Sequence, residues 1–182
     1  MAITEQITTA QQLFQATGLG RCELVLGELV MMSPAGFDHS RIALALGAAL
    51  RNFVKPRGLG VVAGADGGFQ IHDNPDTVRV PDVAYVRAER VPAAPPRGFF
   101  QGPPDLAVEV ISPTDRFSEV TAKVEEWLAA GCREVWVVDP QARTVSVCLT
   151  GTEITILAEG DLLTGGDLLP GFELPVAEVF AA

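Results

Sequence analysis

Apolar residues recur at helical spacing along one stretch of the chain and predict its clearest helix, over residues 38–55. Phe37 or Asp38 begins this helix, and the sequence Pro56-Arg57-Gly58 ends it. His39 therefore lies in its first turn. The apolar positions of the helix are Ile42, Leu46, Ala49, Leu50 and Phe53.

A continuous apolar run between Pro104 and Pro113 predicts a strand that is buried on both faces, as in the centre of a sheet covered by helices. Asp115 precedes a second helix over residues 116–130, and Gly131 ends it. A further buried strand is predicted over residues 134–138. A helix between two buried strands indicates a right-handed crossover.

Alternating apolar and polar residues predict the remaining strands. A β-hairpin with a tight turn at Leu26-Gly27 covers residues 22–32, and a short helix over residues 9–15 precedes it. Repeated Gly, Leu and Pro in residues 160–180 predict loosely packed turns and short strands. The other predicted strands cover residues 61–62, 68–71, 78–86, 144–149 and 153–157.

Together these elements predict an α/β or α+β fold with a mixed central β-sheet flanked by helices. The N-terminal hairpin and a C-terminal β-meander complete it. A chain of 182 residues suits one domain, which we expect to span residues 1–182.

Composition narrows the function classes. The formal net charge of −10 weighs against avid non-specific binding of nucleic acid, which depends on Lys and Arg that neutralise phosphates. Arg87, Arg90 and Arg97 are the nearest approach to a phosphate-binding patch, although solvated side chains are the simpler interpretation. No run spans a bilayer and no signal-peptide pattern opens the chain, so we expect a cytoplasmic protein without membrane partners.

The three cysteines are widely spaced among apolar residues. Their spacing favours buried free thiols over a zinc or redox site.

Three acidic residues occupy predicted strands, where acids are disfavoured: Glu28, Asp82 and Glu109. Glu109 lies within the buried strand, where an isolated carboxylate is costly. If the strands of Asp82 and Glu109 are neighbours, the two carboxylates converge, and a divalent cation with oxygen ligands would relieve their repulsion. Lys123, on the helix that follows Glu109, is a second candidate partner for that carboxylate.

The motifs around these residues resemble the Uma-two restriction-endonuclease family, which belongs to the PD-(D/E)XK nuclease superfamily. The resemblance covers about residues 10–180. It rests on Pro81-Asp82, the run from Pro104 to Pro113, Lys123, Gly131, Glu134 to Pro140, the hairpin from Glu23 to Leu29, and His39.

The resemblance implies a restriction-endonuclease-like core in which Asp82 and Glu109 hold Mg²⁺ or Mn²⁺. The superfamily usually carries a lysine two positions after the second acid, where this chain has Ile111. Lys123 matches a lysine that has moved to the following helix. By the same analogy Glu28 is a metal or water ligand, and His39 contacts a phosphate or the metal's outer shell.

The implied reaction is metal-assisted hydrolysis of DNA phosphodiester bonds, in which Lys123 positions the attacking water or stabilises the transition state. A nuclease of this size usually needs two copies to cut both strands, so we expect a homodimer.

Two alternatives remain open at this point. In the first, the chain is an inactive relic of the nuclease fold that serves as a binding or assembly module, and Glu109 and Lys123 form a structural ion pair. In the second, it hydrolyses another phosphate ester.

Overall fold

The computed structural model describes residues 6–94 and 97–181. Two sheets make up most of the molecule, a six-stranded sheet in the order β11-β10-β9-β8-β6-β3 and a five-stranded sheet in the order β2-β1-β5-β4-β7. A two-stranded ribbon pairs β12 with β13. The strands are β1 (Cys22–Val25), β2 (Glu28–Met31), β3 (Gly60–Gly64), β4 (Phe69–His72), β5 (Thr77–Arg79), β6 (Val83–Arg87), β7 (Phe100–Gln101), β8 (Leu106–Val110), β9 (Glu134–Asp139), β10 (Thr144–Cys148), β11 (Ile154–Leu157), β12 (Leu162–Gly165) and β13 (Leu169–Pro175).

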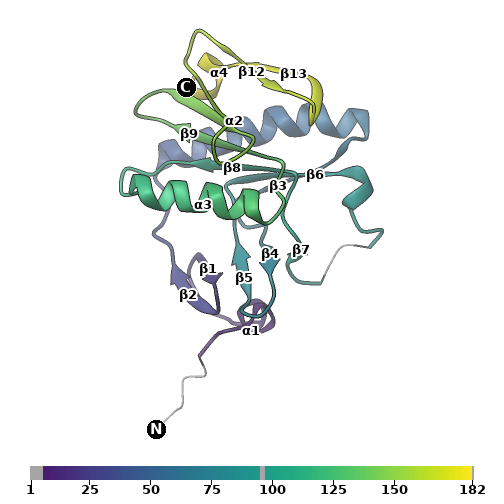
Figure 1. Ribbon diagram of the computed structural model, residues 1–182, viewed down its shortest axis with the longest axis vertical. Helices are drawn as coiled ribbons and strands as arrows, with labels where there is room; N and C mark the ends of the chain where they lie inside the picture. The colour runs from purple at the N-terminus through teal and green to yellow at the C-terminus, as the bar shows by residue number, and fades with distance from the viewer. Residues whose placement is uncertain (1–5, 95–96, 182) are drawn as a thin grey trace.

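The two long helices cover opposite faces of the six-stranded sheet (Figure 1). Helix α2 packs on the face that carries Tyr85 and Val108, and α3 packs on the face that carries Ala84 and Ala107. Both faces of β8 are therefore buried, as its continuous apolar run predicts. The helices are α1 (Ala10–Gln15), α2 (Phe37–Val54), α3 (Phe117–Ala129) and α4 (Val176–Phe180), with 3₁₀ turns η1 (Lys55–Arg57) and η2 (Ala88–Arg90).

The six-stranded sheet is mixed, because β8 pairs antiparallel with β6 and parallel with β9. Helix α3 connects the two parallel strands, so the predicted β–helix–β unit is observed. The expectation of a mixed central sheet flanked by helices is confirmed. The predicted bounds of the two long helices differ from the observed ones by one residue at each end.

The C-terminal segment is packed more tightly than its composition predicts. After the β12–β13 ribbon, α4 returns to α2, and the side chains of Leu163, Leu169, Phe172, Val176 and Phe180 are buried in the same core as the inner face of α2. The prediction of loosely packed turns is wrong here, because glycine and proline interrupt the local pattern while the leucines and phenylalanines still find a distant partner.

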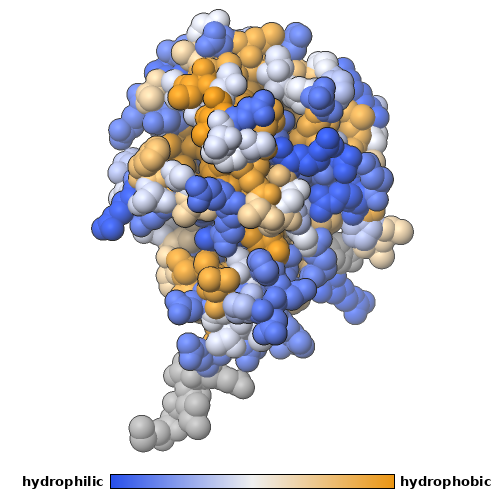
Figure 2. Space-filling model, in the orientation of Figure 1, coloured by the Kyte–Doolittle hydropathy of each residue, from blue (hydrophilic) through white to orange (hydrophobic). Residues whose placement is uncertain are grey.

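Figure 2 shows hydrophobic side chains over the β1–β2 hairpin, where Val30 and Met31 are exposed. In the part of the chain that the structure describes, we find no helix with the length and apolar character that a membrane crossing requires.

Candidate active site

Glu109 on β8 is held by α3. Its Oε1 accepts a hydrogen bond from Trp127 Nε1 at 2.8 Å, and its Oε2 lies 3.2 Å from Lys123 Nζ. Lys123 and Trp127 are one helical turn apart, so they project from the same side of α3 toward the sheet. The sheet-facing position that the sequence predicts for Lys123 is observed.

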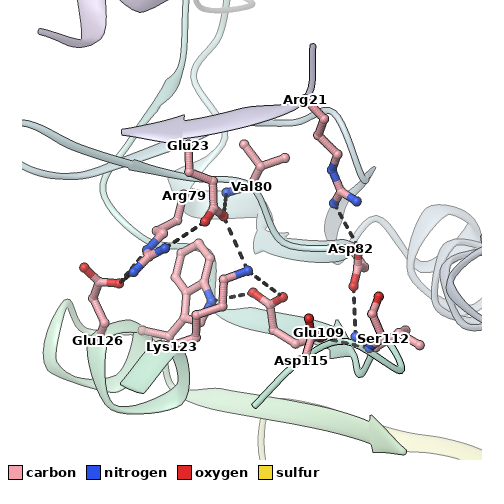
Figure 3. A network of polar contacts seen from close by, with 12 residues as sticks. Arg21, Glu23, Arg79, Val80, Asp82, Glu109, Ser112, Asp115, Lys123 and Glu126 are labelled. Carbon is pink, nitrogen blue, oxygen red and sulfur yellow. Dashed lines mark hydrogen bonds and ion pairs between the residues drawn. The ribbon is translucent and has the colours of Figure 1, made fainter. Parts of the chain in front are cut away.

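Lys123 also reaches a second carboxylate. Its Nζ lies 3.5 Å from Oε1 of Glu23, a residue of β1 that is only 2% exposed. The same oxygen accepts a hydrogen bond from the Val80 N–H at 3.0 Å, and Arg79 Nη1 lies 2.7 Å from the other oxygen. Arg79 continues to Glu126 on α3, so the five-stranded sheet and α3 are joined by one polar network (Figure 3).

Asp82 immediately precedes β6 and is also buried. Its Oδ2 accepts a hydrogen bond from the Val110 N–H at 2.9 Å and lies 3.2 Å from His39 Nε2, while Arg21 Nη2 donates to Oδ1 at 2.9 Å. Val83 pairs with Val108 in the antiparallel register, and the Asp82 N–H donates to the Val108 carbonyl at 3.0 Å, so Asp82 lies beside the end of β8 that carries Glu109. Two neighbouring strands thus deliver one carboxylate each to the same end of the sheet.

The surroundings set the charge of each group. Burial raises the pKa of Glu109, and the negative charges of Asp82 and Glu23 add to this effect against the opposing pull of Lys123. Burial also disfavours the ionised form of Asp82, but hydrogen bonds from His39, Val110 and Arg21 outweigh it and lower the pKa of that carboxyl.

The pKa values of the two basic groups are both raised. The hydrogen bond to Asp82 is the largest influence on His39 and raises the pKa of its imidazole. Burial disfavours the Lys123 ammonium, yet the carboxylates of Glu109 and Glu23 outweigh burial and raise its pKa. Lys123 is therefore a cation at neutral pH.

The cluster is close to charge balance on its own. The acids are Glu23, Asp82, Glu109 and Glu126, and the bases are Arg21, Arg79, Lys123 and His39. Such pairing is what buried carboxylates require, and it leaves no large uncompensated charge.

The donor set nevertheless fits a hard divalent cation. Within residues 6–94 and 97–181, no three His, Cys, Asp or Glu side chains are grouped closely enough to hold a metal ion by themselves. Mg²⁺, however, is usually bound through one or two carboxylates, its own waters and substrate phosphates. Asp82 and Glu109 offer carboxylate oxygens of that kind.

The structure brings together Asp82, Glu109, Lys123 and His39 of the residues that the sequence singles out. The prediction that Glu28 belongs to the site needs correction. It begins edge strand β2, is exposed, and takes no part in the network among the residues that the structure describes. Glu23 on the inner strand β1 occupies the place expected for it, and the missed signal was an acid between the apolar residues Cys22 and Leu24.

Two further expectations are resolved by the contacts. Ile111, at the usual lysine position, packs with the apolar residues beneath α3. Arg87 and Arg90 form ion pairs with the buried Asp105, at the opposite end of β8 from Glu109, so they do not form a phosphate patch beside the site. Both side chains remain partly exposed, and Arg97 is exposed, as the solvated interpretation expects.

Comparisons with known proteins agree with this fold. The crystal structure described as "a putative nuclease belonging to DUF820" from Anabaena variabilis ATCC 29413 is similar, with a TM-score of 0.81, 20% identity, and coverage of 94% of this chain and 97% of that chain. No match is found among curated proteins. The family model named Uma2, with the description "Putative restriction endonuclease", matches residues 10–177. Because that match spans most of the chain, the protein belongs to the Uma2 family and has its restriction-endonuclease-like fold.

Proposed function

We propose that the protein is a metal-dependent nuclease that hydrolyses DNA phosphodiester bonds at the cluster around Asp82, Glu109 and Lys123. The observation that carries the proposal is the meeting of two carboxylates, one on β8 and one directly before the neighbouring strand β6, with a half-buried ammonium 3.2 Å from one of them. Membership of the Uma2 family, whose model has the description "Putative restriction endonuclease", supports the same reaction class.

Each residue has a role that follows from its surroundings. Asp82 and Glu109 would hold Mg²⁺ or Mn²⁺, which when bound polarises the scissile phosphate and lowers the pKa of a bound water. Lys123, held as a cation by two carboxylates, would stabilise the negative charge that develops on the phosphate. His39 fixes the orientation of the Asp82 carboxylate through the contact between Nε2 and Oδ2.

A second candidate function is a binding or assembly module that uses the same fold without catalysis. It is supported by the pairing described above, because each oxygen of Asp82 and Glu109 already has a partner. In that case the acids would serve stability alone.

Calorimetric titration with Mn²⁺, paired with cleavage of fluorescently labelled DNA, separates these functions. We expect the wild type to bind Mn²⁺ and cleave, and Asp82→Asn and Glu109→Gln to lose metal binding and lower cleavage by about 100-fold or more. Lys123→Met should retain metal binding and lower cleavage by about 100-fold. Failure of the folded wild type to bind metal or cleave would support the non-catalytic module.

The hairpin offers a matched pair of variants. Glu23→Gln removes a charge that contacts both Lys123 and Arg79, and we expect cleavage to fall by about 10-fold. Glu28→Gln removes a charge from the same hairpin outside the cluster and should cleave like the wild type. The reverse order of effects would contradict the assignment of Glu23 to the site.

A further inference from the structure

Two phenylalanines stand out from every other hydrophobic side chain that the structure describes. Phe37 and Phe117 are each 88% exposed, whereas the next in order, Leu44, is 73% exposed. Single exposed apolar residues are ordinary on protein surfaces. These two, however, occupy equivalent places, because each is the first residue of a long helix.

Both helices begin beside the candidate active site. In α2, His39 lies two residues after Phe37 and contacts Asp82. In α3, Phe117 follows the loop that leaves the end of β8 at Val110, whose N–H also binds Asp82. Since the two helices lie on opposite faces of the sheet (Figure 1), the two phenylalanines belong to helix starts on opposite sides of it.

The charge of the molecule argues against recognition of a duplex by electrostatics. The protein carries a formal charge of −10, and seven of its 13 Lys and Arg side chains form ion pairs with acids in the described segments. Duplex DNA carries about one negative charge per 1.7 Å, so a protein with this net negative charge gains little electrostatic attraction to it. Binding energy has to come from another source.

A cation stands directly before one of these phenylalanines in the sequence. Arg116 immediately precedes Phe117, is exposed, and makes no ion pair with any residue that the structure describes. An aromatic face next to a guanidinium suits a nucleotide, because the ring stacks on the base while the cation contacts the phosphate.

We propose that Phe37 and Phe117 are stacking platforms for unpaired bases on either side of the scissile phosphate. The substrate class is therefore nucleic acid with single-stranded character at the cleavage site, such as a single strand, an overhang or a flap. Bases in an intact duplex are stacked on each other and cannot cover an outside ring. This inference rests on the proposed nuclease function and names its substrate.

The test measures binding apart from cleavage. Fluorescence anisotropy would measure the binding of the intact protein to labelled oligothymidylate and to a labelled duplex of equal length. Both titrations would contain Ca²⁺ and one fixed low salt concentration. We expect the single strand to bind more tightly than the duplex. Phe37→Leu and Phe117→Leu should each weaken single-strand binding by about five- to tenfold or more, since leucine keeps the hydrophobicity but has no π-face.

Two sets of variants serve as controls. Phe37→Tyr and Phe117→Tyr retain an aromatic face and should bind the single strand like the wild type. Leu44→Ala removes an exposed apolar side chain elsewhere on α2 and should have no effect. Unchanged binding by the leucine variants, or an equal loss for single strand and duplex, would overturn the inference.

The outcomes also separate this inference from the proposed function. If the wild type cleaves duplex DNA and the leucine variants behave identically to it, the proposed nuclease function stands and the stacking role is wrong. A wild type that neither binds nor cleaves any nucleic acid loses both. If the leucine variants instead weaken self-association in sedimentation experiments and leave DNA binding unchanged, the rings form a contact between copies and the inference is wrong.

Discussion

Replacing Lys123 with methionine tests whether the ammonium holds the cluster together. The change keeps an unbranched side chain of similar length and removes the charge that lies 3.2 Å from Glu109 and 3.5 Å from Glu23. Breaking a buried ion pair by removing one partner typically costs about 3–5 kcal/mol. That range is an upper bound for this site.

Three features of the site reduce the cost. The Lys123 side chain is 21% exposed, so water screens part of its interaction. Glu23 keeps its contacts with Arg79 and the Val80 N–H, and Glu109 keeps the hydrogen bond from Trp127. We therefore expect Lys123→Met to lower the free energy of unfolding by about 2 kcal/mol at neutral pH.

A double-mutant cycle with Glu109→Gln isolates the pairwise interaction. Glutamine retains an acceptor for Trp127 but removes the charge that Lys123 neutralises, so the second substitution should cost less once the first is present. Urea denaturation followed by circular dichroism would give the four free energies of unfolding, and we expect a coupling energy of at least about 1 kcal/mol. Additivity within about 0.5 kcal/mol would contradict this expectation, because the two groups would then not interact.

Three further predictions concern groups outside the cluster. Burial raises the pKa of Glu134 above its ordinary value of 4.5, so its stabilising contribution is present at low pH and is lost as the pH rises through the folded-state pKa. Relative to Glu134→Gln, the wild-type Tm should therefore fall as the pH increases, and a constant difference would contradict this. Burial raises the pKa of Cys132 to about 12, so a disulfide reagent should modify it only after unfolding, and rapid labelling of the native protein would disprove its burial. Asp105→Asn leaves Arg87 and Arg90 without their buried carboxylate and should cost about 2–3 kcal/mol in urea denaturation. Cleavage by the folded variant should be unchanged, and lost activity would show that the two ends of β8 are coupled.

Local sequence pattern predicts the parts of this fold that depend on local physics. The long helices follow from apolar spacing and from their stop signals, and the buried strand β8 follows from its uninterrupted apolar run. Glu109 within that apolar run indicates a site, because a buried acid requires a partner from elsewhere in the chain.

Residues that depend on strand order were harder to predict. Glu23 and Glu28 lie on the two strands of one hairpin and look equivalent in sequence. Only the pairing of β1 with β5 makes Glu23 an inner residue and leaves Glu28 on an edge strand. This pairing joins Leu24 to Val78, far apart in the chain, and no local pattern reveals it.

Because Lys123 lies on α3 and not on β8, the cluster forms only when that helix packs against the sheet. A lysine two positions after Glu109 would arrive with the strand itself, but here the cation arrives only when α3 lies against the sheet. A local opening that detaches α3 would dismantle the site while the sheet remains folded. Activity at this cluster would then depend on the stability of the contact between α3 and the sheet. Substitutions at that interface would lower activity before they lower the melting temperature.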